Sequence, residues 1–317
     1  MNSKISVKSS TLGFIAGIFA LITTVAMLIA GRIGATSDVL TIWDLAGIRH
    51  GIAAILAIPI IIYSKPWRIK LGRHLVSSIF GGAPFVLLLF GGMIYAPVSH
   101  AGIFMNGTLP LAATIIAWFW LKEKPDSWQA LGIIIILVGM SLVIWQAVPA
   151  IRSDYWIGHL LFIASGIWFS VWYVSIRAWK QTVVQTLCSL LVFNAVFYTP
   201  IWLIFLPSGI STAPIKDIIL QVIVHGVFGA FLAVFGHAYA ARTIGPMKQS
   251  AIMAGAPVLA LVISVPLLGE VATSIDITGA LIVTFGILLV VGMRLKYSSF
   301  HRVKNKFVYL LFYDRPK

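Results

Sequence analysis

Ten stretches of roughly 20 mostly apolar residues follow one another along the chain, separated by short polar segments. About 20 apolar residues are what one helix needs to cross the hydrocarbon core of a bilayer. The runs are continuous rather than alternating between apolar and polar residues, which excludes a membrane β-barrel. The pattern therefore predicts an all-α membrane protein with ten transmembrane helices. Their expected ranges are 11–31, 42–63, 74–95, 98–121, 127–146, 155–176, 184–206, 217–240, 246–268 and 274–294.

Composition agrees with this prediction and narrows the class. Of the 317 residues, 60% are hydrophobic and only 10% are charged, too few to cover the surface of a soluble enzyme of this length. The single cysteine, Cys188, excludes an intrachain disulfide and a cysteine-based zinc site. The sequence contains no nucleotide-binding loop, dinucleotide fingerprint or histidine motif for zinc. We therefore expect no cofactor, no metal, no ATP hydrolysis and no enzymatic activity.

The net charge of +14 is distributed unevenly between the two sides of the predicted bundle. With the N-terminus inside, 18 of the 23 Lys and Arg residues fall on the inner segments and 3 on the outer ones. Positive charge concentrates on cytoplasmic loops of membrane proteins, so both termini are expected in the cytoplasm. The expected location of the chain is the inner (plasma) membrane. The same bias explains the basic character of the chain without a nucleic-acid partner. The first run is longer than the apolar core of a signal peptide, and we interpret it as an uncleaved helix.

An internal repeat divides the chain into two halves. Five pairs of residues share an offset of 147 positions: Pro110 with Pro257, Leu121 with Leu268, Glu123 with Glu270, Gly132 with Gly279 and Gly139 with Gly286. Five helices per half is an odd number, so the second half enters the membrane from the opposite side. Inverted repeats of this kind are typical of secondary transporters. The expected domains are 1–147 and 148–294, each a five-helix repeat, and a basic cytoplasmic tail, 295–317.

A family resemblance rests on three segments of the chain. The run GIRHGIAAILAIPI resembles the arginine-containing second helix of EamA-type members of the drug/metabolite transporter superfamily. The segments MNGTLPLAATIIAWFWLKEKPDSWQALGIIIILVGMSLVI and MAGAPVLALVISVPLLGEVATSIDITGALIVTFGILLVVG resemble that family's paired signature of a proline-containing helix, Leu-x-Glu and a glycine-rich helix. The resemblance implies a ten-helix fold with a central cavity, alternating access, and transport of small metabolites.

Arg49 is the most unusual residue within the predicted helices. An arginine at a helix centre costs about 2.5–3.5 kcal/mol on insertion scales. It can face a cavity and hold an anionic group of a solute, such as a carboxylate. Alternatively, it can pair with Asp44 or cap carbonyl groups of a neighbouring helix; Asp44 lies five residues earlier, an unfavourable spacing for a pair within one helix. The second half carries Asn194, not arginine, near the mirrored place.

Other polar and aromatic side chains in the spans are candidates for contact with the solute. His50 adjoins Arg49, and His225 lies in mid-helix; both can titrate near neutrality, which makes coupling to protons possible, although a structural role is the commoner one. Trp168 and Trp172 lie four residues apart and can stack on a solute or pack against neighbours. The predicted substrate-binding residues are Arg49, His50, Asn106, Trp168, Trp172, His225 and Gln249.

Glycine and proline residues crowd particular helices, where they permit bending or close packing. The predicted hinge residues are Gly81, Gly82, Pro84, Pro110 and Pro257, with static packing as the alternative. The acidic residues Asp44, Glu123 and Glu270 stand at helix ends, and we expect them to cap helices or bind loops.

These features predict a secondary, ATP-independent transporter of small metabolites, working by alternating access and exporting amino acids or related organic solutes. A channel or facilitator, or a membrane receptor without active transport, is the alternative. The expected partners are a small solute, protons as coupling ions, and the bilayer, with anionic lipid under the basic tail.

Overall fold

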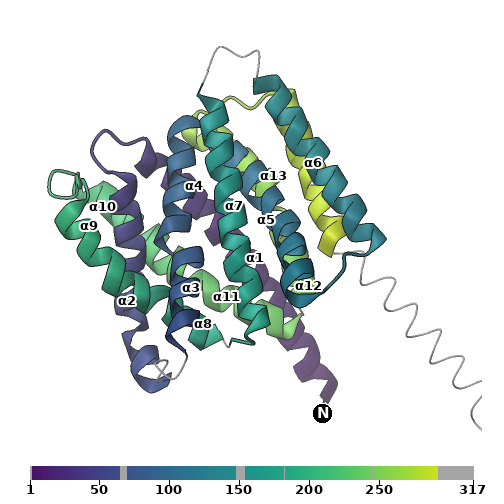
Figure 1. Ribbon diagram of the computed structural model, residues 1–317, viewed down its shortest axis with the longest axis horizontal. Coiled ribbons are helices and arrows are strands. Elements are labelled where there is room, and N and C mark those ends of the chain that lie inside the picture. Colours follow the sequence, from purple (N-terminus) through teal and green to yellow (C-terminus); the bar gives the residue numbers. More distant parts are fainter. Residues whose placement is uncertain (1, 65–69, 148–153, 182, 245, 292–317) are drawn as a thin grey trace, which may run out of the picture.

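The computed structural model describes residues 2–64, 70–147, 154–181, 183–244 and 246–291. Ten segments within these residues are helical, long and apolar enough to cross a membrane, and they coincide with the ten stretches predicted from the sequence. Most of them run side by side in Figure 1, with the start of the chain at the lower edge. The spans are Thr11–Ala35, Ile42–Ile60, Leu71–Tyr95, Val98–Leu121, Ser127–Gln146, Tyr155–Ala178, Val184–Phe205, Ile215–His237, Lys248–Leu268 and Ser274–Val291.

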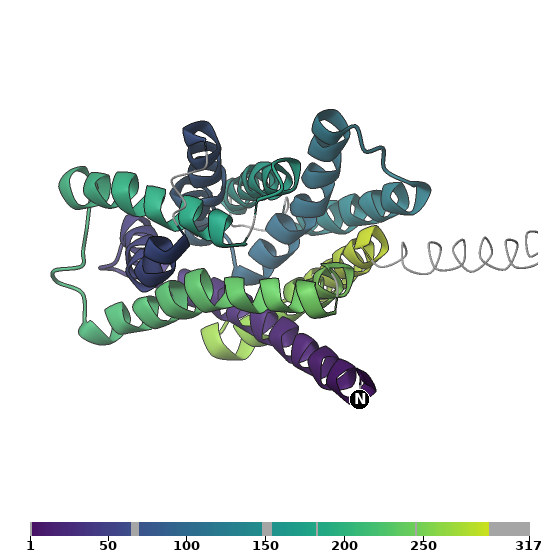
Figure 2. The same cartoon turned by 90° about the horizontal axis from the view of Figure 1, so that it is seen from below.

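Six spans belong to continuous helices and four are divided. The continuous helices are α1 (Asn2–Ala35), α2 (Ile42–Ser64), α5 (Val98–Leu121), α6 (Ser127–Ala147), α7 (Tyr155–Ala178) and the last helix, Ser274–Val291. The divided spans are α3 (Leu71–Gly81) with α4 (Ala83–Tyr95), α8 (Val183–Phe193) with the π-helix η2 (Asn194–Tyr198) and α9 (Thr199–Phe205), α10 (Ile215–Gln221) with the π-helix η3 (Val222–Leu232) and α11 (Ala233–Thr243), and α12 (Pro246–Met253) with α13 (Ala256–Leu268). In Figure 2, α1 crosses beside the eighth span.

The helices of the fifth and tenth spans begin in the same way. The N–H of Gln129 donates to Oδ1 of Asp126 at 2.8 Å, and the N–H of Asp126 donates to Oε1 of Gln129 at 3.1 Å. Thr273 and Asp276 form the same reciprocal pair at 3.1 and 2.9 Å. Such a capping box satisfies amide groups that a helix start leaves without partners. The two boxes are 147 residues apart, which extends the sequence repeat into local structure.

Glycine residues bring the fifth and tenth spans into backbone contact. A Cβ added to Gly132 would lie 2.8 Å from the carbonyl oxygen of Gly286, and one added to Gly139 would lie 3.1 Å from that of Gly279. The residue numbers rise along one helix as they fall along the other, so the helices are antiparallel. They lie together at one edge of the bundle in Figure 1. The predicted inverted repeat is confirmed, and its two halves meet here through the glycines that revealed it.

Two arginine–carboxylate pairs among the described residues tie one half of the chain to the other, one on each face of the bundle. On the face that we call the Glu123 face, Nη2 of Arg177 donates to Oε1 of Glu123 at 2.7 Å, and both side chains are largely exposed. On the opposite Glu270 face, Arg32 lies 3.6 Å from Glu270, which also accepts the N–H of Val98 at 2.9 Å, and this pair is mostly buried. Each carboxylate follows the fourth helix of its own repeat and meets an arginine near the end of the first helix of the other.

We expect Gly286→Ala to lower the stability of the purified protein in detergent. The added methyl group would lie 2.8 Å from the backbone oxygen of Gly132, which cannot move aside as a side chain can, and overpacking of this kind costs about 1–3 kcal/mol. Thermal unfolding measures the loss. Gly51→Ala is the matched control, because its Cβ would meet nothing within 4 Å. Equal melting temperatures for the two variants would contradict this account of the helix pair.

Candidate functional site

The third span is interrupted at Gly82, and a side chain from the other repeat closes the interruption. The N–H of Ala83 donates to Oδ1 of Asn194 at 2.9 Å, and Nδ2 of Asn194 lies 3.4 Å from the carbonyl oxygen of Ser78. A side chain at position 82 would overlap the Asn194 amide, so only glycine permits this approach. Asn194 begins the π-helix η2, which places its amide against the gap. The break therefore needs both halves of the protein.

Two tryptophan residues of α7 support the same break from the side. Nε1 of Trp168 donates to the carbonyl oxygen of Ile79 at 2.7 Å. The Trp172 ring packs on Gly81, where an added Cβ would come within 2.7 Å of it. Pro84 stands in the first turn of α4, where its missing N–H is not needed. The predicted hinge residues of this span and the predicted tryptophans are thus brought together.

An apolar cleft of about 500 Å³ lies between α2, α4 and α7. Its lining includes Trp168 and Pro84, two of the residues selected from the sequence. The lining residues are Ile42, Trp43, Pro84, Leu87, Leu88, Gly91, Ile94, Tyr95, Leu161 and Trp168. With no charged residue in this wall, the cleft suits an apolar group and offers nothing that would neutralise an ion.

Arg49 occupies a different place, between α1, α2 and η3. Its Nη1 contacts Sδ of Met27 and lies 3.4 Å from where a Cβ on Gly229 would be. No described carboxylate lies within 4.0 Å of the guanidinium nitrogens, and Nε is buried without a hydrogen-bond partner among the described residues. A thioether is a weak acceptor for a guanidinium, so a partly buried cation is left without a described anion.

Further unsatisfied polar groups surround Arg49. His50 and His225 are 1% and 0% exposed, both are electrostatic neighbours of Arg49, and none of their ring nitrogens has a described partner. One helical turn from His225, Nε2 of Gln221 donates to the carbonyl oxygen of Ala30 at 3.0 Å, while Oε1 has no described partner. Buried polar groups in proteins are almost always hydrogen-bonded. This concentration of orphaned atoms in one place is what a polar ligand would satisfy.

The Arg49 site and the Asn194 brace are two versions of one contact. Gly82 and Gly229 are 147 residues apart, and Asn194 follows Arg49 by 145. Asn194 lies against Gly82, and Arg49 lies against Gly229 within the π-helix η3. The first contact is closed by hydrogen bonds within the protein, whereas the second ends in an unpaired guanidinium. π-Helical segments occur frequently at functional sites.

Asp44 does not pair with Arg49. Its Oδ2 accepts the N–H of Thr41 at 2.9 Å and that of Gly209 at 3.0 Å. Its Oδ1 accepts from Nε1 of Trp202 at 2.8 Å and from Oγ of Ser208 at 2.5 Å. The carboxylate therefore caps α2 and fastens it to α9 and to the segment after α9, in the other repeat. This occupation of every lone pair removes the intramolecular partner considered for Arg49.

Two predicted binding residues lie away from Arg49. Nε2 of Gln249 lies 3.0 Å from Nδ1 of His237, and its side chain packs on Gly17 of α1. Nδ2 of Asn106 is buried without a described partner in α5. No described contact joins either amide to Arg49. Their assignment to the binding site stays a prediction.

The two mirrored prolines, Pro110 and Pro257, have different surroundings. The helix α5 continues through Pro110, so the kink expected there does not interrupt it. The ninth span is divided between Met253 and Ala256, and Pro257 stands in the first turn of α13, packed on Gly102 of α5. A role for either proline as a hinge stays a prediction.

The fold defines a class: a multi-pass membrane protein of two inverted five-helix repeats. The chain belongs to the EamA-like transporter family, which it matches over residues 9–145 and again over 156–292. The resemblance drawn from the sequence is confirmed, and the protein is a membrane transporter. The expected boundaries at 147/148 and 294/295 stay predictions, and the tail lies outside the described residues.

Chains of known structure share this fold. One of them, titled "Crystal structure of protein", has a TM-score of 0.61 and 17% sequence identity, and the match covers 89% of this chain and 96% of that one. Likeness at that identity shows the fold alone. No curated protein matches the chain.

We expect Asn194→Ala to destabilise the protein, because it leaves the N–H of Ala83 buried without an acceptor at a cost of about 1–3 kcal/mol. Thermal unfolding of the purified variant measures this loss. Thr199→Val is the control in the same span, since the Thr199 hydroxyl is buried and has no described partner to lose. A melting temperature for Asn194→Ala as high as that of Thr199→Val would contradict the role given to the Asn194 amide.

Proposed function

We propose that the protein is a secondary transporter that exports amino acids or related organic solutes by alternating access, without ATP hydrolysis and without enzymatic activity. The observation that carries this proposal is the Arg49 guanidinium, which is enclosed between α1, α2 and η3 with no described carboxylate to neutralise it. A guanidinium binds a carboxylate through two parallel hydrogen bonds. A carboxylate on the solute would supply the missing charge.

The groups around Arg49 favour a solute that also carries an ammonium group. His50 and His225 are buried beside Arg49, and a neutral imidazole offers one lone pair. Oε1 of Gln221 offers another acceptor one turn away. Donors from Arg49 and acceptors from its neighbours together complement the two charged ends of an amino acid.

Movement of the solute requires the two repeats to change their relation. We propose that Gly81, Gly82 and Pro84, at the break of the third span, absorb part of this change, together with Pro110 and Pro257. Breaks in helices facing a polar interior are common in carriers, because the freed backbone groups line the path. Trp168 would present its ring to the solute from the cleft that it lines.

The membrane setting of this proposal follows from charge. We propose that the protein lies in the inner (plasma) membrane with both termini in the cytoplasm, because 18 of its 23 basic residues then fall inside. On this orientation the Glu270 face is the outer one. We also propose that protons drive export and that the basic tail contacts anionic lipid.

Arg49→Ala should abolish export. The test compares extracellular metabolites from two cultures, one overproducing the wild type and one overproducing Arg49→Ala. A small set of carboxylate-bearing solutes should be enriched outside the wild-type cells alone. Counterflow of those solutes in proteoliposomes then separates a carrier from a channel. Lys124→Ala, an exposed loop residue, controls for removal of a positive charge. Enrichment equal in both cultures would contradict the role of Arg49, and flux without counterflow would contradict a carrier.

Substitutions at His225 and Gln221 should separate the two ends of the solute. In counterflow, His225→Phe and Gln221→Leu should weaken competition by the amino acid about tenfold, the worth of one hydrogen bond of about 1.4 kcal/mol. Competition by the same acid lacking its amino group should stay unchanged. Arg49→Gln should weaken both competitors. If all three variants weakened both competitors equally, the assignment of separate roles would be wrong.

A further inference from the structure

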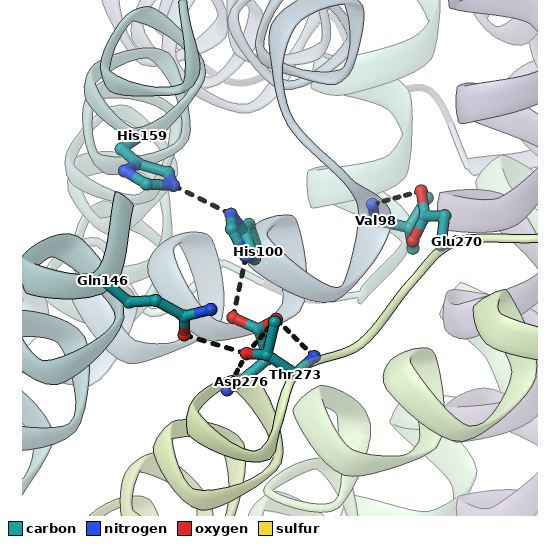
Figure 3. A network of polar contacts seen from close by, with 7 residues as sticks. All are labelled: Val98, His100, Gln146, His159, Glu270, Thr273 and Asp276. Atoms are coloured by element: carbon teal, nitrogen blue, oxygen red, sulfur yellow. Dashed lines mark hydrogen bonds and ion pairs between the residues drawn. The ribbon is translucent and has the colours of Figure 1, made fainter. Parts of the chain in front are cut away.

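Three titratable side chains form a hydrogen-bonded chain at the Glu270 face, away from the contacts of Arg49 (Figure 3). Nε2 of His100 lies 3.1 Å from Oδ1 of Asp276, and Nδ1 of His100 lies 2.9 Å from Nε2 of His159. All three residues are at most 5% exposed. The sequence shows no motif here, because His159 lies 59 positions after His100 and Asp276 lies 176 positions after it.

The surroundings of Asp276 fix the direction of these bonds. Its Oδ2 accepts the N–H of Thr273 at 2.9 Å in the capping box of the last helix, which requires an acceptor. With Oδ2 engaged in the cap, Oδ1 of an ionised carboxylate accepts from Nε2–H of His100. Nδ1 of His100 is then free either to accept from His159 or to donate to it. The same atoms therefore accommodate two states that differ by one proton.

The two protonation states differ in the net charge of the cluster. In the first, both histidines are neutral and Nε2–H of His159 donates to Nδ1 of His100, giving the cluster a net charge of −1. When a proton binds Nδ1 of His159, its Nε2 proton transfers to Nδ1 of His100. An imidazolium then lies between the Asp276 carboxylate and a neutral His159, and the cluster is neutral. A buried cluster without net charge is less costly than one with a charge of −1.

Aromatic rings and one ion pair lie around the cluster. The Tyr155 ring centroid lies 5.6 Å from that of His100, and the Phe104 ring stacks on His159 at 4.2 Å. Glu270 binds the first turn of α5 at Val98, but Arg32 lies 3.6 Å from it and offsets its charge. Among the described contacts of the two histidines, the negative charge that an imidazolium would offset is that of Asp276.

The chain also connects the two repeats. His100 belongs to α5 of the first repeat, whereas His159 and Asp276 belong to α7 and the last helix of the second. Oγ1 of Thr273 donates to Oε1 of Gln146 at 2.8 Å, which adds α6 to the same junction. Any gain in the strength of these bonds holds the two repeats more firmly together at the Glu270 face.

We propose that His100, His159 and Asp276 form a proton-binding site that takes up one proton and thereby strengthens the contact between the two repeats at the Glu270 face. Its use in driving export rests on the proposed function, but the binding of the proton does not. His50 and His225, which the sequence suggested for proton coupling, have no described hydrogen-bond partner to receive a proton and lie beside the Arg49 cation.

Histidine-selective ¹⁵N NMR of the full chain in lipid bilayers, titrated from about pH 5 to pH 9, tests the site. Single His→Gln variants assign the signals. We expect the His100 and His159 signals to shift together in one transition. Asp276→Asn keeps a cap acceptor but removes the charge, and it should weaken proton binding at least about tenfold. His74→Gln, which removes a buried histidine bonded to Ser189, should leave the transition unchanged. Independent transitions, or none, would overturn the proposal.

Hydrogen exchange measures the strength of this contact between the repeats. Corrected for intrinsic rates, the amides of residues 96–101 and 269–276 should exchange several-fold more slowly on the acid side of the transition in the wild type. In His100→Gln and Asp276→Asn this difference should vanish. A difference of equal size in the variants would show that the proton acts elsewhere. Loss of counterflow with intact NMR and exchange results would count against the proposed transport alone.

Discussion

The constraint on which this structure depends is that backbone groups inside a bilayer must find partners within the protein. Continuous helices meet it along most of their length, and capping boxes meet it where the last helix of each repeat begins. The break at Gly82 meets it only because Asn194 and Trp168 reach across from the second repeat. The two halves are therefore held together by apolar packing and also by hydrogen bonds from the second repeat to backbone groups at this break.

The inverted symmetry places two equivalent contacts between the repeats, and they differ in how their polar groups are paired. Each repeat places a polar side chain of its second helix against the glycine in the third helix of the other. In one direction the side chain is Asn194, and its amide completes the hydrogen bonding of the protein. In the other it is Arg49, whose guanidinium meets no described carboxylate and lies beside ring nitrogens of His50 and His225 that have no described partner. The proposed binding site therefore lies where the two repeats differ.

Much of the architecture could be predicted from the sequence because its signals are local. Apolar runs of fixed length gave the ten spans, and five pairs of residues at one offset revealed the inverted repeat. Arg49 stood out because a charge within an apolar run is costly. Gln221 had a similar signal, a buried amide four residues before His225, but it was missed.

The remaining features depend on pairings that no local pattern encodes. The sequences of the π-helices η2 and η3 do not separate them from ordinary helix, although η3 contains Gly226 and Gly229. Asn194 was recognised as the mirror of Arg49, but its partner Ala83 lies 111 residues away, and only the fold shows that they meet. The same holds for the histidine and aspartate chain at the Glu270 face, and for Asp44, whose partners in the other repeat lie more than 150 residues away.

The most direct test of the central claim is a structure of the protein with an exported solute bound. The account predicts the solute carboxylate on the Arg49 guanidinium, in place of the Met27 contact, with the break at Gly82 still closed by Asn194. A solute held elsewhere, for example wholly within the apolar cleft beside Trp168, with Arg49 still against Met27, would contradict it.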